Sequence, residues 1–303
     1  PRDATGARHP IRPMPGMELV VSTDRLVANV HFLTDADPAA LGWKALAVNL
    51  SDLAAMGAEP RWALLAIALP ESKERWIEPF AEGFFSCAGA FGVDLVGGDT
   101  TRGPLAIAPT VIGEVPIGSA ITRAGAKPGD DVWVSGTPGL AALALAASRG
   151  ETNLAGATRA RCHAALERPQ PRVALGLALR GLAHAMIDVS DGLIADLGHI
   201  ADRSEIAIEL ADDLLPMHIL EAATGEPGLA RRCLLAGGDD YELAFTSAAD
   251  QRERVATVGA RLDIALTRIG QARCGPAGEL RVVDRHGESL PVAGRGYEHF
   301  AEE

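Results

Sequence analysis

Aspartates follow short apolar runs at three points of this 303-residue chain. Asp24, Asp99 and Asp188 each stand at the end of a run that predicts a buried strand. Carboxylates at strand ends face one edge of a sheet, where like charges repel strongly unless they are solvated, capped or bound to a metal. Magnesium favours oxygen ligands, usually one or two carboxylates together with phosphates and waters. The pattern therefore predicts a shared magnesium site that binds phosphate groups.

Two further aspartates extend this pattern. Asp52 lies near the end of an otherwise apolar helix, and Asp191 precedes Gly192 at the start of another. Taken singly, Asp52 is typical of a solvated helix face and Asp191 of a helix N-cap. The Gly-Gly-Asp sequences at 97–99 and 237–239 are typical of tight turns. It is the number of acids at the ends of elements that favours a metal site over these separate interpretations.

Two basic side chains are candidates for contacts with a substrate. Arg123 lies in a predicted loop, where it could neutralise phosphate charge or stand as an ordinary surface charge. His31 follows a short apolar run and is either a loop histidine or a ligand contact. The sequence carries no phosphate-binding P-loop, no dinucleotide-binding glycine motif, no serine nucleophile elbow and no zinc-protease helix motif. Phosphate chemistry would therefore depend on metal ions and glycine-rich turns.

Periodicity predicts two α/β units. The first reads β-α-β-α-β-β, with strands at 19–21, 62–69, 93–96 and 105–115, helices at 38–56 and 76–91, and a loop at 97–104. A segment rich in Gly, Pro and Lys follows at 116–131 and marks a boundary. The second unit is α+β, with strands at 132–135, 185–189, 205–210, 242–246, 264–269 and 280–284, Ala-rich helices up to 184, and helices at 192–203, 219–223 and 251–261. We therefore expect domains 1–117 and 118–303.

Composition excludes several classes of partner. The 28 Lys and Arg residues against 40 Asp and Glu residues give a net charge of −12, which disfavours binding to nucleic acid or anionic lipid. The four cysteines form no CxxC pair, so neither a zinc site nor a disulfide framework is indicated. No apolar run approaches the ~20 residues that span a bilayer, and residues 1–12 lack the apolar core of a signal peptide. These features predict a cytoplasmic protein.

Six segments resemble the thiamine-monophosphate kinase family, a branch of the aminoimidazole ribonucleotide synthetase superfamily. They occur in the family's order along nearly the whole chain, at 20–27, 44–57, 97–103, 187–193, 237–243 and 296–300. The resemblance implies an N-terminal α/β domain with a larger C-terminal α+β domain. It also implies ATP and thiamine monophosphate as substrates, Mg²⁺ as cofactor, and a homodimer built through the N-terminal domain.

The resemblance further implies a role for particular residues. The expected reaction is ATP-dependent phosphorylation of thiamine monophosphate to thiamine diphosphate, without a covalent nucleophile. The metal-binding positions would be Ser22, Thr23, Asp24, Asp52, Asp99, Asp188 and Asp191. Gly98, Asp99, Arg123 and Ser190 would contact ATP, and His31 and Asp239 the acceptor substrate.

Three positions depart from the family pattern. Asp239 is a shorter acid than the Glu common at its place, and Gly294 stands where an aromatic is expected to stack on the thiamine rings. The family's Gly-Asp-Asp segment is replaced by Thr-Gly-Ala-Arg-His-Pro at 5–10. Either the chain has lost that acid, or the sequence omits a loop within 5–13 that carries it. The alternatives are another ATP-dependent synthetase of the superfamily and a non-catalytic relative that binds nucleotide.

Overall fold

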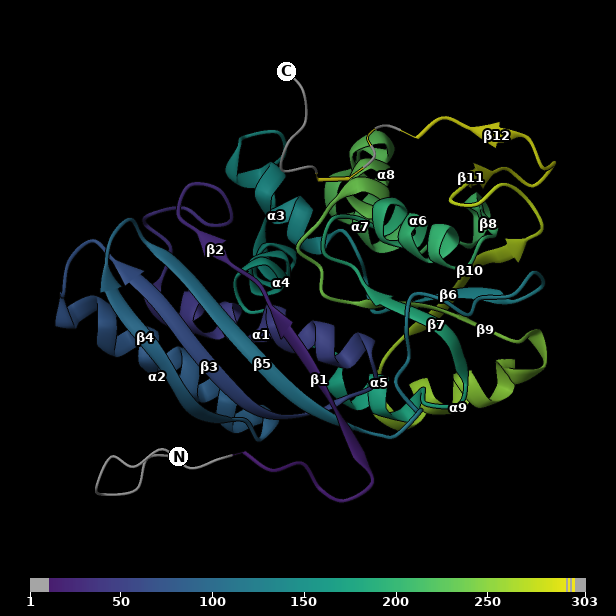
Figure 1. The fold of residues 1–303 in the computed structure, drawn as a ribbon. Helices are drawn as coiled ribbons and strands as arrows, with labels where there is room; N and C mark the ends of the chain where they lie inside the picture. Colours follow the sequence, from purple (N-terminus) through teal and green to yellow (C-terminus); the bar gives the residue numbers. More distant parts are fainter. Residues whose placement is uncertain (1–10, 293, 295, 298–303) are drawn as a thin grey trace.

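The first half of the chain forms one mixed sheet with two helices on one face (Figure 1). The computed structural model describes residues 11–292, 294, 296 and 297. The strand order is β1-β5-β3-β4, with β2 also paired to β5; β3 and β4 pair in parallel and the other pairs are antiparallel. The elements are β1 (Met17–Thr23), β2 (Leu26–Val27), α1 (Pro38–Ala55), β3 (Glu59–Leu69), α2 (Glu74–Phe91), β4 (Asp94–Arg102) and β5 (Ala106–Pro116).

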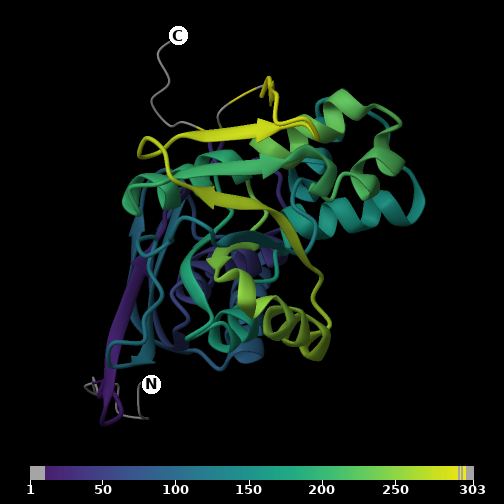
Figure 2. The ribbon, with the colours of Figure 1, turned by 90° about the vertical axis from the view of Figure 1, so that its right-hand side faces the viewer.

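The second half forms a seven-stranded sheet in the order β12-β11-β8-β10-β6-β9-β7. Figure 2 shows the N-terminal sheet along one side of the molecule and this larger unit on the other. Its strands are β6 (Asp131–Ser135), β7 (Ala183–Asp188), β8 (Ala207–Ala211), β9 (Leu243–Ser247), β10 (Leu266–Arg273), β11 (Leu280–Val283) and β12 (Ser289–Leu290). Its helices are α3 (Leu140–Ser148), α4 (Gly156–Glu167), α5 (Val173–Ala178), α6 (Leu193–Arg203), α7 (His218–Thr224), α8 (Pro227–Ala236) and α9 (Arg252–Leu262).

The predicted two-unit α/β architecture is confirmed. The predicted division between residues 117 and 118 falls between the two sheets and stays a prediction. Each half has its own apolar core, and a third cluster of buried side chains joins α1 and α5 to β7, β9 and α9. No helix among the described residues is long and apolar enough to cross a membrane.

Local signals determine where α1 begins and ends. Pro38 occupies its first turn, and the Asp37 carboxylate accepts the backbone N–H of Ala40 at 2.8 Å. After the helix, Gly57 takes a left-handed φ of 62°, which a glycine adopts without strain. The helix predicted over residues 38–56 is therefore confirmed to within one residue.

Helix α1 lies between the two halves of the molecule. It packs closely on α2, because a Cβ added to Gly42 would lie 2.0 Å from the backbone oxygen of Phe80, where no side chain fits. It also contacts β5 of its own half and β7 and α5 of the other. Most of the helix is buried as a result. Polar side chains of α1 can thus reach groups in both halves.

The glycine-rich segment after residue 96 was predicted wrongly as a loop. It continues β4, whose residues 97–102 pair in parallel with residues 64–69 of β3. Asp99 consequently lies inside a strand and not after one. The pairing with β3 overrides the weak strand propensity of glycine. The short strands β2 and β12 and helix α8 were also missed.

Candidate active site between the two halves

The end of β1 and helix α1 place two acids side by side in the N-terminal half. Asp24 directly follows β1, and its backbone N–H donates to Oδ1 of the buried Asn49 at 2.7 Å. The Ser22 hydroxyl donates to Oδ2 of Asp52 at 2.5 Å. Both contacts tie the end of β1 to α1. Asn49 carries no sequence signal of its own and was not anticipated.

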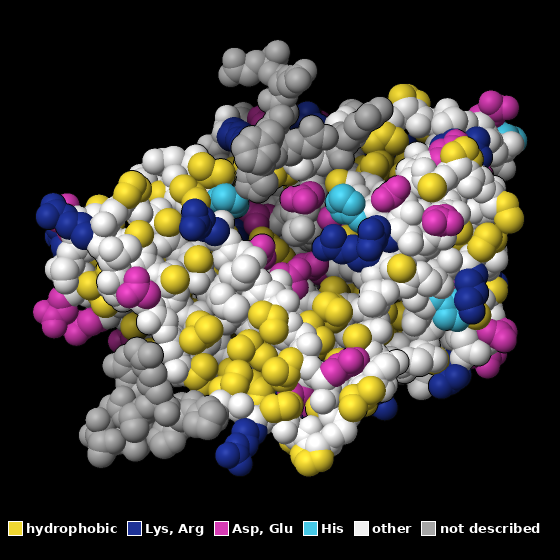
Figure 3. Space-filling view, in the orientation of Figure 1, with side chains coloured by type: hydrophobic (Ala, Val, Ile, Leu, Met, Phe, Trp, Pro, Cys, Tyr) yellow, Lys and Arg dark blue, Asp and Glu magenta, His cyan; other side chains and the backbone are white. Residues whose placement is uncertain are grey.

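The C-terminal half contributes acids at the end of β7. Asp188 is the last residue of β7 and is 5% exposed, and Asp191 lies in the loop before α6. Because α1 packs on β7, these acids face those of the N-terminal half. Figure 3 shows acidic side chains gathered in a hollow between the two halves, with basic and histidine side chains at its rim.

Burial and mutual repulsion disfavour the ionised form of these carboxylates. Burial, followed by the charges of Asp52 and Asp191, raises the pKa of Asp24 from 3.8 to about 6. Burial also raises the pKa of Asp52, while the Ser22 hydroxyl and the Arg123 guanidinium act in the opposite direction. Burial and then the charge of Asp52 raise the pKa of Asp188 well above its usual range. A bound cation would relieve this repulsion.

The donor set suits magnesium shared with a phosphate better than an ion held by protein alone. Within the described ranges, no three His, Cys, Asp or Glu side chains converge into a ready-made metal-binding group. Magnesium keeps several waters and is commonly bound through one or two carboxylates plus substrate phosphates. Carboxylates that influence one another's pKa without forming a closed cage fit that requirement. Arg123, which acts on Asp52 from the linker between the sheets, adds a positive charge at the same place.

Other residues predicted for the metal or ATP lie differently. Thr23 turns toward β5, where its hydroxyl donates to the Pro109 oxygen at 2.9 Å and accepts from Thr110 at 3.1 Å. Asp99 is exposed on β4, three strand spacings from β1, or about 14 Å. Gly98 precedes it at φ 150°, and a Cβ there would meet the Leu65 oxygen at 1.9 Å. Within one chain the structure does not bring Asp99 to the acids of the cleft, and its metal role stays a prediction.

The loop before α6 is held by an acid that the sequence did not single out. Oδ2 of Asp196 accepts the backbone N–H groups of Ser190, Asp191 and Gly192 at 3.0, 3.1 and 3.2 Å. Asp191 is not a helix N-cap, since Gly192 occupies that position. Burial, followed by the charge of Asp191, raises the pKa of Asp196 to about 7 despite these hydrogen bonds. Ser190 and Asp191 are thereby presented toward the cleft as one rigid turn.

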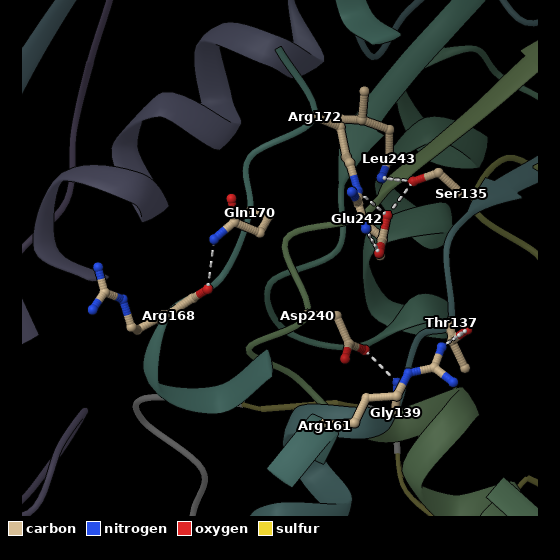
Figure 4. Close-up of polar contacts among 10 residues, drawn as sticks. All are labelled: Ser135, Thr137, Gly139, Arg161, Arg168, Gln170, Arg172, Asp240, Glu242 and Leu243. Atoms are coloured by element: carbon tan, nitrogen blue, oxygen red, sulfur yellow. Dashed lines mark hydrogen bonds and ion pairs between the residues drawn. The ribbon is translucent and has the colours of Figure 1, made fainter. Parts of the chain in front are cut away.

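The acids of the segment at 239–242 have separate partners. Asp240 accepts the Gly139 N–H at 2.7 Å, and Glu242 accepts the Arg172 guanidinium and the Ser135 hydroxyl (Figure 4). The Asp239 side chain is 33% exposed. Asp240 and Glu242 thus bind groups of the protein itself, and Asp239 is the acid that can contact a substrate.

Two further residues concern the substrate side: His31, which was predicted to contact the acceptor, and Tyr297, which was not. His31 lies in a turn, where its Nδ1 accepts the Val27 N–H at 3.1 Å. Tyr297 is 49% exposed, and its backbone N–H donates to the Asp191 oxygen at 2.9 Å, which brings the C-terminal segment to the acidic cleft. Tyr297 lies in the segment at 296–300 that resembles the family, but no role was predicted for it. The acid-free segment at 5–10 lies outside the described residues.

Comparisons with known proteins identify the family of this chain. The model of the AIR synthase related protein N-terminal domain matches residues 7–115, and that of the C-terminal domain matches residues 127–283. The thiamine-monophosphate kinase of Escherichia coli K12 is 45% identical over 93% of this chain and 87% of its own length. That of Bacillus subtilis is 36% identical over 94% of this chain and 89% of its own length.

Solved structures also show similarity to thiamine-monophosphate kinases. The thiamine-monophosphate kinase of Stenotrophomonas maltophilia K279a superposes with a TM-score of 0.85 at 49% identity, covering 92% of this chain and 89% of that one. The structure described as AaThiL complexed with AMPPCP and TMP has a TM-score of 0.79 at 30% identity, covering 95% of this chain and 89% of that one. This chain therefore belongs to the thiamine-monophosphate kinase family of the AIR synthase related proteins.

Proposed function

We propose that this protein is an ATP-dependent thiamine-monophosphate kinase that transfers the terminal phosphoryl group of ATP to the phosphate of thiamine monophosphate, giving thiamine diphosphate. The observation that carries the proposal is the group of carboxylates from both halves, whose pKa values are raised by desolvation and by one another. Such a cleft favours polyphosphates that arrive with divalent cations. The relative that holds AMPPCP and TMP supports this pair of substrates.

The acidic cleft is the proposed site of Mg²⁺. Asp24, Asp52, Asp188 and Asp191 are the carboxylates best placed to hold it, with Ser22 and Thr23 at the end of β1. Bound magnesium would neutralise phosphate oxygens and so lower the cost of bringing two anions together. Asp99 belongs to the proposed ligand set only if another chain presents it.

The protein's own contribution is to position the two phosphates. Phosphoryl transfer requires little covalent help from side chains, so no nucleophile is assigned. Arg123 is suited to neutralise charge on the transferred group, and the N–H groups and hydroxyl of the turn at Ser190 to orient ATP. Gly98, which keeps β4 close to β3, stays in the proposed ATP set.

The acceptor would lie toward Asp239 and His31. Gly294 offers no ring, and a Cβ there would contact Ala236 at 3.3 Å. We assign the aromatic contact with thiamine to Tyr297, because its backbone is bonded to Asp191 and its side chain is half exposed beside the cleft. Thiamine would then lie between this ring and the Asp239 side.

The proposed assembly is a homodimer built through domain 1–117, with domain 118–303 completing each cleft. The face of the N-terminal sheet opposite α1 and α2 exposes Leu19, Val21 and Leu64 at 42%, 59% and 38%. A contiguous apolar face of this kind is typical of a protein interface. Four free cysteines support a cytoplasmic location. We assign neither a nucleic-acid nor a membrane partner, in keeping with the net charge of −12.

A coupled assay of ADP release tests the function. We expect turnover that requires both thiamine monophosphate and Mg²⁺, with unphosphorylated thiamine as the control acceptor. Thiamine diphosphate should appear in a 1:1 ratio with ADP. Full activity in excess chelator would exclude the metal site. ADP release that does not depend on thiamine monophosphate would favour another synthetase of the superfamily, and nucleotide binding without turnover a non-catalytic relative.

A further inference from the structure

Lys44 is buried in helix α1, yet its ammonium group reaches across to the C-terminal half. The residue is 5% exposed, and its Nζ donates to Oδ2 of Asp239 at 2.8 Å and to the Leu166 oxygen at 3.0 Å. Burying an ammonium is costly unless it is paired, and an apolar side chain would fill the same space at lower cost. The position of this lysine therefore points to a task beyond packing.

Asp239 is held from two directions. Lys44 donates to one carboxylate oxygen, and the Tyr241 hydroxyl donates to the other at 2.9 Å. The backbone of Asp239 has a φ of 68° and that of Tyr241 a φ of 53°, in the left-handed region that non-glycine residues enter when their surroundings impose it. Both the position and the rotation of this partly exposed carboxylate are thus fixed.

Helix α1 connects this carboxylate to the acids of the metal side. Asn49, which receives the Asp24 N–H, and Asp52 lie on the same helix as Lys44. Lys44 and Asp52 are eight residues apart, or about 12 Å along the helix axis. Next to Lys44, Nε1 of Trp43 donates to the Pro169 oxygen at 2.8 Å and anchors the same stretch of helix. One rigid element therefore sets the spacing between Asp239 and the metal-side carboxylates.

We infer that Lys44 is a positioning residue for the acceptor substrate: acting through Asp239, it holds thiamine monophosphate at a fixed distance from the acids that bind the phosphates of ATP. The inference rests on the proposed function.

Steady-state kinetics of the full-length chain test this inference. Lys44→Met should raise KM for thiamine monophosphate about 10- to 100-fold, the cost of losing one charge-assisted hydrogen bond. KM for ATP should change less than about threefold, since the ATP side keeps its contacts. Lys44→Arg, which retains the charge, should recover part of the loss. Lys73→Met is the matched control, because Lys73 is 46% exposed and pairs with Glu71 at the surface.

A double variant separates positioning from general loosening. If Lys44 acts through Asp239, Lys44→Met combined with Asp239→Asn should raise KM for the acceptor no further than Asp239→Asn alone. The double variant removes both charges of the pair, so it also serves if Lys44→Met alone fails to fold in a thermal melt. Multiplying effects, a wild-type KM in Lys44→Met, or an equal rise in KM for ATP would each overturn the inference. A wild-type chain without acceptor-dependent turnover would instead refute the proposed function and, with it, this role.

Discussion

Asp52 is the residue on which most of the cleft's interactions converge. It accepts the Ser22 hydroxyl, acts on the pKa values of Asp24 and Asp188, and is itself acted on by Arg123. No other acid of the described cleft is linked in this way to β1, β7 and the linker together. Folding disfavours the ionised form of Asp52, so its negative charge is useful only when a cation accompanies the substrates.

Asp52→Asn is therefore expected to lower turnover by about 10²-fold or more, since it removes a carboxylate from a site that binds polyanions with metal. Its thermal midpoint should stay the same or rise, because a buried charge with a raised pKa is lost. The measurements are initial rates with saturating Mg²⁺ and a thermal melt. Asp35→Asn, at an exposed turn, is the control. Normal turnover in Asp52→Asn would contradict the metal-binding role and leave Asp52 only a structural contact with Ser22.

At the scale of elements, the turn before α6 depends on one side chain of that helix. Asp196 accepts three N–H groups that are buried or partly buried, and two of them belong to Ser190 and Asp191. The first turn of α6 thus holds the ATP-side turn much as α1 holds the metal acids.

Asp196→Ala should weaken both stability and ATP binding. Leaving buried donors unpaired costs about 1–3 kcal/mol of unfolding free energy, and the turn should exchange its amide hydrogens faster. We expect a higher KM for ATP with a smaller change for the acceptor. Hydrogen exchange of residues 190–192 and urea unfolding provide the readouts. Asp202→Ala, an exposed acid on the same helix, is the matched control. Unchanged exchange at 190–192 would count against this role.

Whether an element could be predicted from the sequence depends on whether its signals are local. Helix α1 could be predicted because Asp37, Pro38 and Gly57 are local signals that act within a few residues of its ends. The strand character of 97–102 could not, because it comes from pairing with β3. The roles of Lys44 and Asp196 could not be predicted for the same reason. The partner of Lys44 lies in the other half of the molecule, and the partners of Asp196 are backbone groups that any residue would provide.

At the scale of the whole molecule, the acidic cleft makes metal-free stability depend on pH. The pKa of Asp24 rises to about 6 and that of Asp196 to about 7, both from 3.8. A raised pKa means that the folded state binds more protons than the unfolded state. The stabilisation is complete below pH about 4 and is lost as the pH rises through 6 and 7.

The midpoint of thermal unfolding without metal should therefore fall between pH 5 and pH 8, and added Mg²⁺ should raise it most at pH 8 because the ion binds the folded, ionised cleft. Differential scanning fluorimetry at several pH values, with and without Mg²⁺, measures both effects. Asp24→Asn should show a shallower fall, which separates the contribution of Asp24 from those of histidines elsewhere. An equal slope in this variant would contradict the assignment.

The open face of the N-terminal sheet should bring two copies together. Val21→Glu would place a charge on this apolar face, and a two-fold interface would contain the change twice. We expect the wild type to sediment as a dimer at micromolar concentration and Val21→Glu to shift toward monomer. Phe85→Glu, on α2 in the helical layer behind the sheet, is a matched control because Phe85 is 55% exposed. A strictly monomeric wild type would refute this arrangement.

The same face gives Asp99 a route to a cleft. Asp99 pairs with Ala66 on β3, and Leu64, two residues earlier on that strand, is exposed on the outer face. Paired residues of neighbouring strands point to the same side of a sheet, so Asp99 projects from the outer face, away from α1 and α2. The proposed dimer would cover this face. If Asp99 binds metal as the family pattern implies, the partner's cleft is the one that it would complete.

Mixing two inactive variants decides this point. When Asp52→Asn and Asp99→Asn chains are unfolded together and refolded, half of the dimers are mixed. If Asp99 serves the partner, each mixed dimer has one site with both changes and one site with neither, so activity should return to about 25% of wild type by the statistics of a two-fold dimer. Each variant refolded alone provides the control. If Asp99 serves its own chain, every site carries a change and mixing restores nothing.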